Sequence, residues 1–267
     1  MNELYQYLFF YSAKFFLFFT HETIIVPLIV IGFIMGKRED FKSALYLILF
    51  TMIFNTVLKV TFEVPLAPHL QKLGYAFPSG HMQCAFVFYG WLALRTHSFF
   101  LKKTILILLI GCAWALVYLK YHTWWDVLGS IIFGIFTLSV YLFLFRKFGK
   151  FNPKLTGIFF FSTPSLFLGY LGYKGMIFPH VWMAYYALIG FFLAESIFET
   201  SYKLSWKKGL LGILGCLSFI FLIHSFFQKF LLEQVPFYIF EIQWLLCAVS
   251  LPFSVKILSL FEKHESF

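Results

Sequence analysis

The sequence predicts an all-α, polytopic integral membrane protein, a bundle of about nine transmembrane helices. Of its 267 residues, 61% are hydrophobic and only 12% are charged, and the mean hydropathy is +0.83. A water-soluble domain of this length does not tolerate so apolar a composition. The hydrophobic residues also form separate runs near the length of about 20 residues that spans the hydrocarbon layer of roughly 30 Å. Basic residues gather between alternate runs, as they do in membrane proteins of fixed orientation.

The predicted spans follow one another along the chain with polar connections between them. Their expected bounds are 23–36, which is short for a span, 41–61, 81–99, 104–119, 127–145, 155–171, 176–198, 209–227 and 237–258. A further aromatic and weakly charged stretch, 4–19, is expected to lie in the interface or to insert partly. Because this stretch has neither a basic start nor a small-residue cleavage site, we do not expect a removed signal peptide.

Two connections are the most polar. Residues 63–80 form the expected active-site loop, in which three prolines and Gly74 break helices. Residues 146–154 mark a soft boundary. We therefore divide the chain into a motif-bearing domain, 1–150, and a group of C-terminal transmembrane helices, 151–267, to which the sequence assigns no role.

Most basic residues lie in alternate connections, and this pattern predicts the orientation of the chain. Fifteen of the 21 lysines and arginines fall into five groups: Lys37, Arg38 and Lys42; Arg95, Lys102 and Lys103; Arg146, Lys147, Lys150 and Lys154; Lys203, Lys207 and Lys208; Lys256 and Lys263. The positive-inside rule places these groups in the cytoplasm. The polar residues from 59 to 81 and His122 then face the extracytoplasmic side of a plasma or inner membrane.

The net charge of +9 does not indicate a nucleic-acid partner, because the basic residues sit at helix ends rather than on one face. Membrane lipids are the expected partners, and the sequence does not define an oligomeric state. The cysteines lie within apolar spans and lack metal-type spacing, so we expect small core residues rather than disulfides or metal ligands: Cys84, Cys112, Cys216 and Cys247.

Two short polar motifs beside apolar segments indicate phosphate chemistry. The run Phe-Pro-Ser-Gly-His, which ends at His81, opens an apolar segment with a hydroxyl cap, free backbone N–H groups and the positive end of a helix dipole, and these favour an anion. About forty residues later, His122 is a candidate nucleophile. Asp126, four residues on, can hydrogen-bond the far ring nitrogen if the segment is helical, which fixes the tautomer and raises the basicity of the attacking nitrogen. As a helix-start carboxylate, Asp126 would also favour the helix dipole.

These motifs resemble those of the type 2 phosphatidic acid phosphatase family, which shares its site with vanadium haloperoxidases and bacterial acid phosphatases. The family pattern is a Lys followed after six residues by Arg-Pro, then Pro-Ser-Gly-His, then Ser-Arg with a His six residues after the Arg and an Asp four later. Here the first part reads KVTFEVPLA from Lys59, the second is complete, and the third reads ALVYLKYHTWWD and ends at Asp126. The resemblance covers roughly residues 20–146.

The resemblance implies a phosphohistidine mechanism that needs no metal or other cofactor. His122 would attack phosphorus, and Asp126 would orient it. His81 would protonate the leaving oxygen and later help to activate water. The phosphoryl oxygens would be bound by three groups: Lys59, Ser79 and the backbone N–H of Gly80.

Both arginines of the family pattern are missing, and Leu66 and Leu116 take their places. The arginines that the chain does contain all fall on the predicted cytoplasmic side: Arg38, Arg95 and Arg146. A phosphate monoester carries close to two negative charges and is usually held by bidentate guanidinium groups. Lys120, within the third motif, is the first candidate to compensate, and Lys72 in the loop is another. His69, in the same loop, is expected at the surface rather than in catalysis.

The expected function is that of a membrane lipid phosphatase. Its substrate would be a phospholipid or a polyprenyl (pyro)phosphate, such as phosphatidate or a phosphatidylglycerol phosphate, that arrives from the lipid side. The missing arginines keep two alternatives open. One is a transferase for a phosphodiester head group, which carries a single negative charge; sphingomyelin synthases look similar in keeping two His and the Asp without the same arginines. The other is a non-catalytic, lipid-binding pseudoenzyme.

Overall fold

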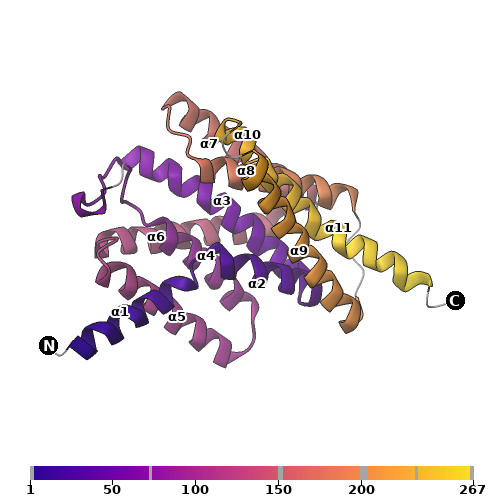
Figure 1. Cartoon of the computed structure of the whole chain (residues 1–267), viewed down its shortest axis with the longest axis horizontal. Coiled ribbons are helices and arrows are strands. Elements are labelled where there is room, and N and C mark those ends of the chain that lie inside the picture. Colours follow the sequence, from indigo (N-terminus) through magenta and orange to yellow (C-terminus); the bar gives the residue numbers. More distant parts are fainter. Residues whose placement is uncertain (1–2, 72–73, 150–152, 199–203, 232–233, 265–267) are drawn as a thin grey trace. The chain divides into compact units, whose positions relative to one another are not determined.

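The computed structural model describes residues 3–71, 74–149, 153–198, 204–231 and 234–264 (Figure 1). Over these ranges the chain forms helices joined by turns and connections. An isolated antiparallel bridge joins Pro65 to Tyr75, and the described ranges contain no β-strand. The predicted all-α fold is therefore confirmed.

The helices lie close to the predicted spans. They are α1 (Glu3–Phe18), α2 (Glu22–Met35), α3 (Arg38–Phe62), η1 (Pro68–Leu70), α4 (Gly80–Arg95), α5 (Phe99–Tyr118), α6 (Trp124–Leu144), the π-helical turn η2 (Phe145–Gly149), α7 (Pro153–Tyr173), α8 (Pro179–Ile197), α9 (Trp206–Phe230), α10 (Phe237–Phe240) and α11 (Gln243–His264). Each predicted run corresponds to one helix, except that a break after Phe240 divides the last run into α10 and α11.

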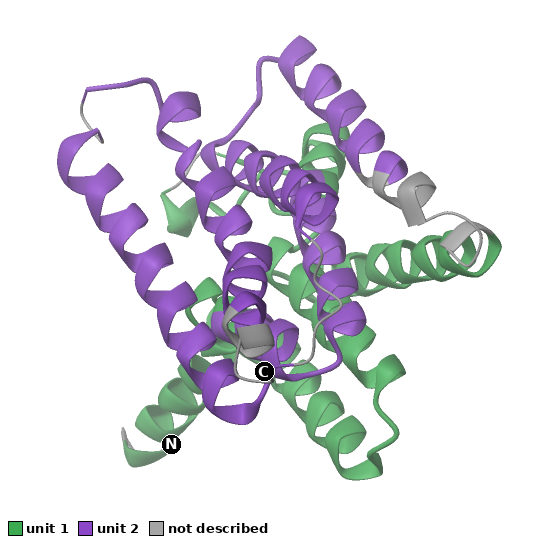
Figure 2. Cartoon of the chain, turned by 90° about the vertical axis from the view of Figure 1, so that its right-hand side faces the viewer, with its two compact units in different colours: residues 1–26, 54–152 green, residues 27–53, 153–267 purple. Residues whose placement is uncertain are grey.

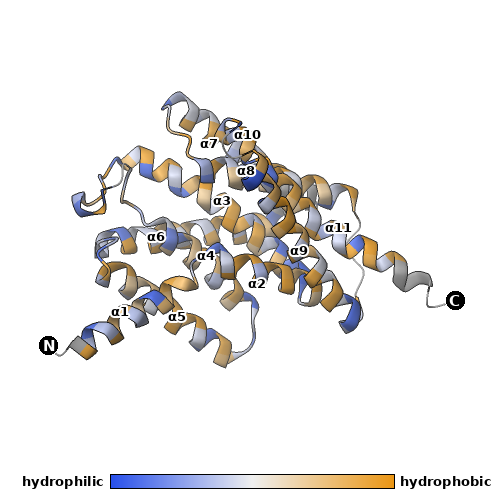
Figure 3. Cartoon of the chain, viewed as in Figure 1, coloured by the Kyte–Doolittle hydropathy of each residue, from blue (hydrophilic) through white to orange (hydrophobic). Residues whose placement is uncertain are grey.

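The polytopic membrane fold is confirmed, with a smaller number of spans than predicted. Six segments of the described chain are long and apolar enough to cross a membrane: Arg38–Phe62, Phe99–Tyr118, Trp124–Lys147, Pro179–Ile197, Trp206–Phe230 and Phe237–Leu260. Hydrophobic residues make up most of these helices (Figure 3). Helices α1 and α2 meet at a bend of 41° and add a seventh span if they count as one. Helix α2 has 14 residues and α4 has 16. At 1.5 Å per residue they reach roughly 21 and 24 Å, less than the hydrocarbon thickness.

Two compact units make up the chain (Figure 2). Unit 1 contains residues 1–26 and 54–152, and unit 2 contains residues 27–53 and 153–267. Helix α2 begins in unit 1 and ends in unit 2, whereas α3 begins in unit 2 and ends in unit 1. The predicted site residues all belong to unit 1. The functional division at residue 150 stays a prediction.

In unit 1, α4 packs against α5 and α6, and α1 packs against α5. Two glycines allow these helices to approach closely. A Cβ on Gly111 of α5 would lie 2.2 Å from the ring of Phe16 on α1, and a Cβ on Gly134 of α6 would lie 2.6 Å from the ring of Phe86 on α4. Small residues at such crossings are typical of membrane helices. They hold α1, α4, α5 and α6 together as one packed group.

In unit 2, α11 packs against α8 and α9, and α7 packs against α8. Gly190 of α8 lies against the backbone of α11, since a Cβ there would come within 2.3 Å of the carbonyl oxygen of Leu245. An ion pair joins Lys42 of α3 to Glu195 of α8. The cysteines lie in the helices of the two units; Cys84 is half-buried and the other three are buried.

Candidate active site

The predicted phosphate-binding turn caps helix α4. Ser79 is fully buried, and its Oγ accepts a hydrogen bond from the backbone N–H of Met82 at 3.5 Å, so that α4 begins at Gly80. The first N–H groups of a helix have no partner within it, and the helix dipole places partial positive charge there. This turn is therefore suited to an anion. Gly80 also keeps the turn close to α3, because a Cβ there would lie 3.0 Å from Oδ1 of Asn55.

Hydrogen bonds join this turn to the start of α6. The N–H of Ser79 donates to the carbonyl oxygen of Asp126 at 3.2 Å. The hydroxyl of Ser130 lies 2.9 Å from the carbonyl oxygen of Ser79 and 2.6 Å from that of Asp126, so these two acceptors share its proton. All three residues are buried. The second and third motif parts, distant in the sequence, thus meet at two adjacent helix starts.

His122 lies in the turn that connects α5 to α6. The backbone N–H groups of Tyr121 and His122 both donate to the carbonyl oxygen of Leu116, at 3.0 and 3.2 Å. The His122 side chain is 8% exposed, and its Nδ1 atom lies 3.5 Å from Oδ2 of Asp126. The two groups would form an ion pair only with a protonated ring, and Nδ1 makes no hydrogen bond to the described residues. Because Nδ1 faces the carboxylate, the other ring nitrogen, Nε2, is the one that a substrate phosphorus can meet.

The surroundings of His122 favour its neutral form. Burial lowers the pKa of His122 from the ordinary value of 6.5, and the positive charge of Lys59 lowers it further. The carboxylate of Asp126 raises this pKa without overcoming those two effects. At neutral pH the imidazole therefore has a free electron pair, which a nucleophile requires.

Asp126 takes part in the capping box of α6 and faces His122 with the same oxygen, Oδ2. Its Oδ2 accepts hydrogen bonds from the N–H of Thr123 at 2.7 Å and from the Thr123 hydroxyl at 3.0 Å. The Thr123 Oγ1 in turn accepts from the N–H of Asp126 at 3.3 Å, which completes a capping box, and α6 begins at Trp124. His122 therefore precedes the helix, so a shared helical segment is not what brings the pair together. The capping box turns the carboxylate back toward the residues before α6.

Helix α3 supplies polar groups from its last two turns. The Nζ of Lys59 donates to the carbonyl oxygen of Tyr75 at 2.8 Å, just before the Pro-Ser-Gly-His turn. One turn earlier, Nδ2 of Asn55 donates to the carbonyl oxygen of Pro78 at 3.2 Å and to Oε1 of Gln83 at 2.8 Å. Asn55 and Gln83 are both buried. The Pro-Ser-Gly-His turn is thereby held by hydrogen bonds from both α3 and α6.

His81 is the second residue of α4, and its side chain is exposed. Its ring lies against the ring of His21, which occupies the turn between α1 and α2; the ring centroids are 5.8 Å apart and the planes meet at 63°. His81 follows Ser79 by two residues, so it belongs to the helix start that is bonded to Asp126. Its role as an acid and base stays a prediction.

Lys120, the first candidate to replace the missing arginine charge, is exposed and has a left-handed backbone conformation with φ of 57°. Its carbonyl oxygen lies 2.9 Å from Nε2 of His69 in η1, so the active-site loop contacts the turn that carries His122. His69 is exposed, as the sequence predicts. A contribution of Lys120 to phosphate binding stays a prediction, and Lys72 lies outside the described residues.

The leucines at the two arginine positions supply no charge. Leu116 is 1% exposed and belongs to the core, whereas Leu66 is half-buried in the loop, where its N–H donates to the carbonyl oxygen of Gly74 at 3.3 Å. Lys59 is the lysine whose positive charge acts on the site in the structure, because it lowers the pKa of His122. In the part of the chain that the structure describes, no three His, Cys, Asp or Glu side chains are arranged to hold a metal ion.

Five residues at or next to the site escape prediction from the sequence: Asn55, Gln83, Thr123, Ser130 and His21. Asn55 and Gln83 carry a usable signal, because an amide within an apolar span is costly unless it is hydrogen-bonded and therefore tends to have a function. Thr123 precedes the apolar run of α6 and is three residues before Asp126, which is the spacing of a capping box. His21 has no comparable pattern around it.

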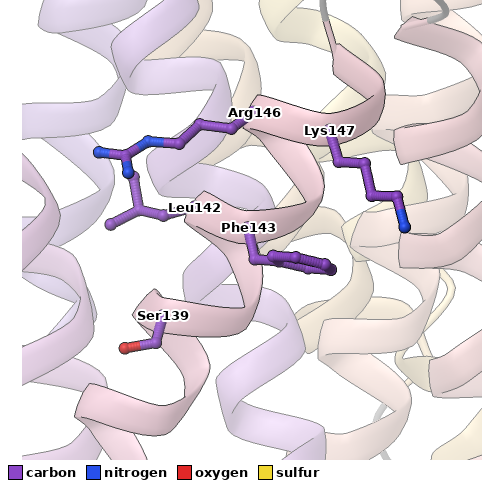
Figure 4. A pocket seen from close by; sticks show the side chains of 5 residues that line it. All are labelled: Ser139, Leu142, Phe143, Arg146 and Lys147. Atoms are coloured by element: carbon purple, nitrogen blue, oxygen red, sulfur yellow. The ribbon is translucent and has the colours of Figure 1, made fainter.

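An open hollow lies at the other end of α6 from Asp126 (Figure 4). It is lined by Ser139, Leu142, Phe143, Arg146 and Lys147. Figure 4 shows Arg146 extending on the side of Leu142 and Lys147 on the side of Phe143. These residues belong to α6 and η2, and their two cations form part of a predicted cytoplasmic group. The hollow is therefore separate from the site around His122.

Comparison with known protein families finds a match over part of the chain. Residues 41–150 match the sequence model of the PAP2 superfamily, whose members are typically phosphatase-type enzymes. Comparisons with curated proteins and with solved structures found no match. The matched segment contains all three motif parts, from Lys59 to Asp126, and both of the joined helix starts. Residues 41–150 of the chain are therefore similar to the PAP2 superfamily.

Proposed function

We propose that this protein is a membrane lipid phosphatase that works through a phosphohistidine intermediate on His122. The observation that carries the proposal is the buried, neutral imidazole of His122 beside the carboxylate of Asp126, next to a capped helix start suited to a phosphate. A nucleophile, an orienting carboxylate and an anion-binding turn within one unit are the parts that phosphoryl transfer needs. The similarity of residues 41–150 to the PAP2 superfamily supports phosphatase-type chemistry.

In the first step, Nε2 of neutral His122 attacks the substrate phosphorus. A bond forms between Nε2 and phosphorus, the bond from phosphorus to the leaving oxygen breaks, and His81 gives its proton to that oxygen. The imidazole gains positive charge as it is phosphorylated, and the carboxylate of Asp126 stabilises this charge. Thr123 keeps the carboxylate in place through two hydrogen bonds to Oδ2.

In the second step, water attacks the phosphohistidine. Neutral His81 takes a proton from the water as its oxygen bonds to phosphorus, the bond to Nε2 breaks, and inorganic phosphate leaves. His122 returns to its neutral form and His81 is protonated again. The ammonium of Lys59, the hydroxyl of Ser79 and the N–H of Gly80 stabilise the phosphoryl oxygens in both steps, since donors fixed in advance need not reorganise as charge develops.

The proposed substrate is a lipid whose phosphate lies at the boundary between membrane and water. The groups that would bind it stand at helix ends: Lys59 in the last turn of α3, Ser79 before α4 and His122 between α5 and α6. Because α3, α5 and α6 are long enough to span, their ends lie near this boundary. Phosphatidate, a phosphatidylglycerol phosphate and a polyprenyl (pyro)phosphate all fit this description, with the lipid chain entering from the membrane.

The replacement of both family arginines favours one second function, transfer of a phosphodiester head group between lipids. Leu116 lies in the core and Leu66 in the loop, so neither helps to neutralise a substrate. A phosphodiester has a single negative charge and needs fewer cations than a monoester. The same His122 and Asp126 would form the covalent intermediate, and the hydroxyl of an acceptor lipid would replace water in the second step.

The test is turnover by the purified protein in lipid-containing micelles. Phosphate release from phosphatidate and polyprenyl pyrophosphate is compared with head-group transfer from phosphodiester lipids, for the wild type and for His122→Ala. We expect phosphate release that His122→Ala abolishes and that His97→Ala preserves, because His97 is exposed beyond the opposite end of α4.

Other outcomes separate the alternatives. Transfer without phosphate release would support the head-group transferase. Robust activity of His122→Ala would contradict the histidine mechanism, and absence of turnover with every lipid would favour a lipid-binding protein.

A further inference from the structure

A histidine outside the PAP2 segment lies against His81. His21 occupies the turn between α1 and α2 and precedes the matched residues 41–150. The two ring centroids are 5.8 Å apart, and both side chains are exposed. None of the three motif parts includes His21, so this contact is a feature of the present chain that the motifs do not explain.

Contacts from two helices fix this turn within unit 1. The hydroxyl of Tyr89, about two turns after His81 on α4, donates to the carbonyl oxygen of Phe19 at 2.8 Å. The thiol of Cys112 on α5 donates to the carbonyl oxygen of Phe16 at 3.2 Å. Because α4 and α5 both hold the end of α1, the packing of the unit presents the turn to His81.

A second contact places α1 beside the turn that carries His122. The Nζ of Lys14 on α1 donates to the hydroxyl of Tyr121 at 3.2 Å and lies 5.7 Å from the centroid of its ring. Tyr121 directly precedes His122. Helix α1 therefore contacts the His122 turn through Lys14, and the turn that follows α1 contacts the start of α4 through His21. This N-terminal segment lies beside both of those helix starts.

We propose that His21 binds the leaving group and makes the enzyme favour lipid pyrophosphates over lipid monophosphates. This inference rests on the proposed function. In an in-line displacement the attacking and leaving atoms lie on opposite sides of phosphorus. His122 is nearly buried, whereas His81, which protonates the leaving oxygen, is exposed beside His21. The group that departs next to His81 therefore meets His21.

The chemistry of the leaving group decides what His21 contributes. With a lipid pyrophosphate, the bond between the terminal phosphorus and the bridging oxygen breaks, the proton of His81 goes to that oxygen, and a lipid phosphate anion departs. An N–H of the His21 ring donates a hydrogen bond to this anion and keeps its proton; hydrogen bonds to charged groups are the stronger ones. With a lipid monophosphate, the leaving group is a neutral alcohol, which gains less from the same donor.

The experiment compares kcat/KM for a polyprenyl pyrophosphate and for the monophosphate of the same chain length. We expect His21→Ala to lower the value about tenfold for the pyrophosphate and less than about twofold for the monophosphate. His21→Lys restores a hydrogen-bond donor and should recover most of the pyrophosphate activity. His97→Ala, the control at an exposed histidine beyond the other end of α4, should change neither value.

Three results would overturn the inference. An equal loss with both substrates would make His21 a structural residue of the turn, and unchanged values with both would show that it does not meet the leaving group. If the wild type hydrolysed the monophosphate alone, the inferred preference for pyrophosphates would be wrong, while the proposed function would stand. The proposed function fails separately, if His122→Ala retains hydrolysis of either substrate.

Discussion

In the proposed mechanism, His122 must be neutral to attack phosphorus and must tolerate positive charge once phosphorylated, and its surroundings suit both needs. Burial and the ammonium of Lys59 lower its pKa, so the free residue holds no extra proton at neutral pH. The carboxylate of Asp126, 3.5 Å from Nδ1, would then stabilise the charge that the proposed reaction places on the ring. One buried pair of residues thus combines a neutral resting state with a stabilised charged intermediate.

The acid limb of the pH dependence of kcat/KM should lie below pH 6.5. Because the pKa of His122 is lowered from that value, the neutral nucleophile persists where an ordinary histidine is protonated, and kcat/KM reports the free enzyme. Asp126→Asn removes the group that raises this pKa, so the limb should move to still lower pH. The rate should also drop at least about tenfold, because the charged ring loses its partner. An acid limb above pH 6.5, or an upward move in Asp126→Asn, would contradict the assignment of His122.

At the scale of helices, the site is built from two N-terminal caps that are bonded to each other. Ser79 caps α4, Thr123 caps α6, and the hydroxyl of Ser130 contacts backbone carbonyl groups at both starts. The carboxylate in the α6 cap is the same one that faces His122. The stability of these helix starts and the geometry of the site are therefore coupled.

Replacing the caps of α5 and α6 separates stability from activity. Thr123→Ala removes the hydroxyl that donates to Oδ2 of Asp126, whereas Ser98→Ala removes the α5 cap, which accepts from the N–H of Leu101 at 3.2 Å. Each change should lower the free energy of unfolding by about 1 kcal/mol. Thr123→Ala alone should also lower kcat, by about tenfold, because it loosens the carboxylate. Equal kcat in the two variants would show that the capping box does not position Asp126.

The hydroxyl of Ser130 links the starts of α4 and α6, and Ser130→Ala measures what this link contributes to stability and to kcat. The matched control is Thr137→Val, because the buried Thr137 hydroxyl donates to the carbonyl oxygen of Phe133 within α6. Both variants lose a buried hydroxyl and should lose about 1 kcal/mol of stability. Only Ser130→Ala removes a donor to Ser79, and its kcat should fall about tenfold. If both variants kept the wild-type kcat, the link would be structural alone.

Helix starts are predictable from the sequence because the residues that form them are close neighbours. Ser79 lies beside the start of α4, and Asp126 lies within the first turn of α6. The partners that join these starts are not predictable in the same way. Whether Asn55 or Ser130 faces the phosphate-binding turn depends on how helices far apart in the sequence pack, and hydropathy carries no information about that.

The same reason applies to His21, whereas the number of spans differs for a local reason. His21 reaches the site because α1 packs on α5, a contact between segments that are far apart along the chain. The sequence also extends the span after the Pro-Ser-Gly-His motif to residue 99, whereas α4 ends at Arg95. The apolar run predicts a helix but not its length. The backbone becomes extended at Thr96, so α4 ends before a full crossing.

Over the whole molecule, the distribution of charge predicts that the site faces the outside of the cell. Gln71, in the active-site loop, and Lys102, near the start of α5, are both exposed. A membrane-impermeant thiol reagent applied to intact cells should label Gln71→Cys and should label Lys102→Cys only after the membrane is opened. The native cysteines are buried or half-buried, which keeps the background low. The reverse labelling pattern would place the site in the cytoplasm.

Trapping a phosphorylated His122 tests the proposed chemistry most directly. The purified protein is mixed with phosphatidate or a lipid pyrophosphate labelled at its terminal phosphate, quenched within one turnover and digested. We predict a phosphoryl group that is labile in acid and stable in alkali, on the peptide that contains His122, present in His97→Ala and absent from His122→Ala. A label on a different residue, or turnover by His122→Ala at the wild-type rate, would contradict a phosphohistidine at this site.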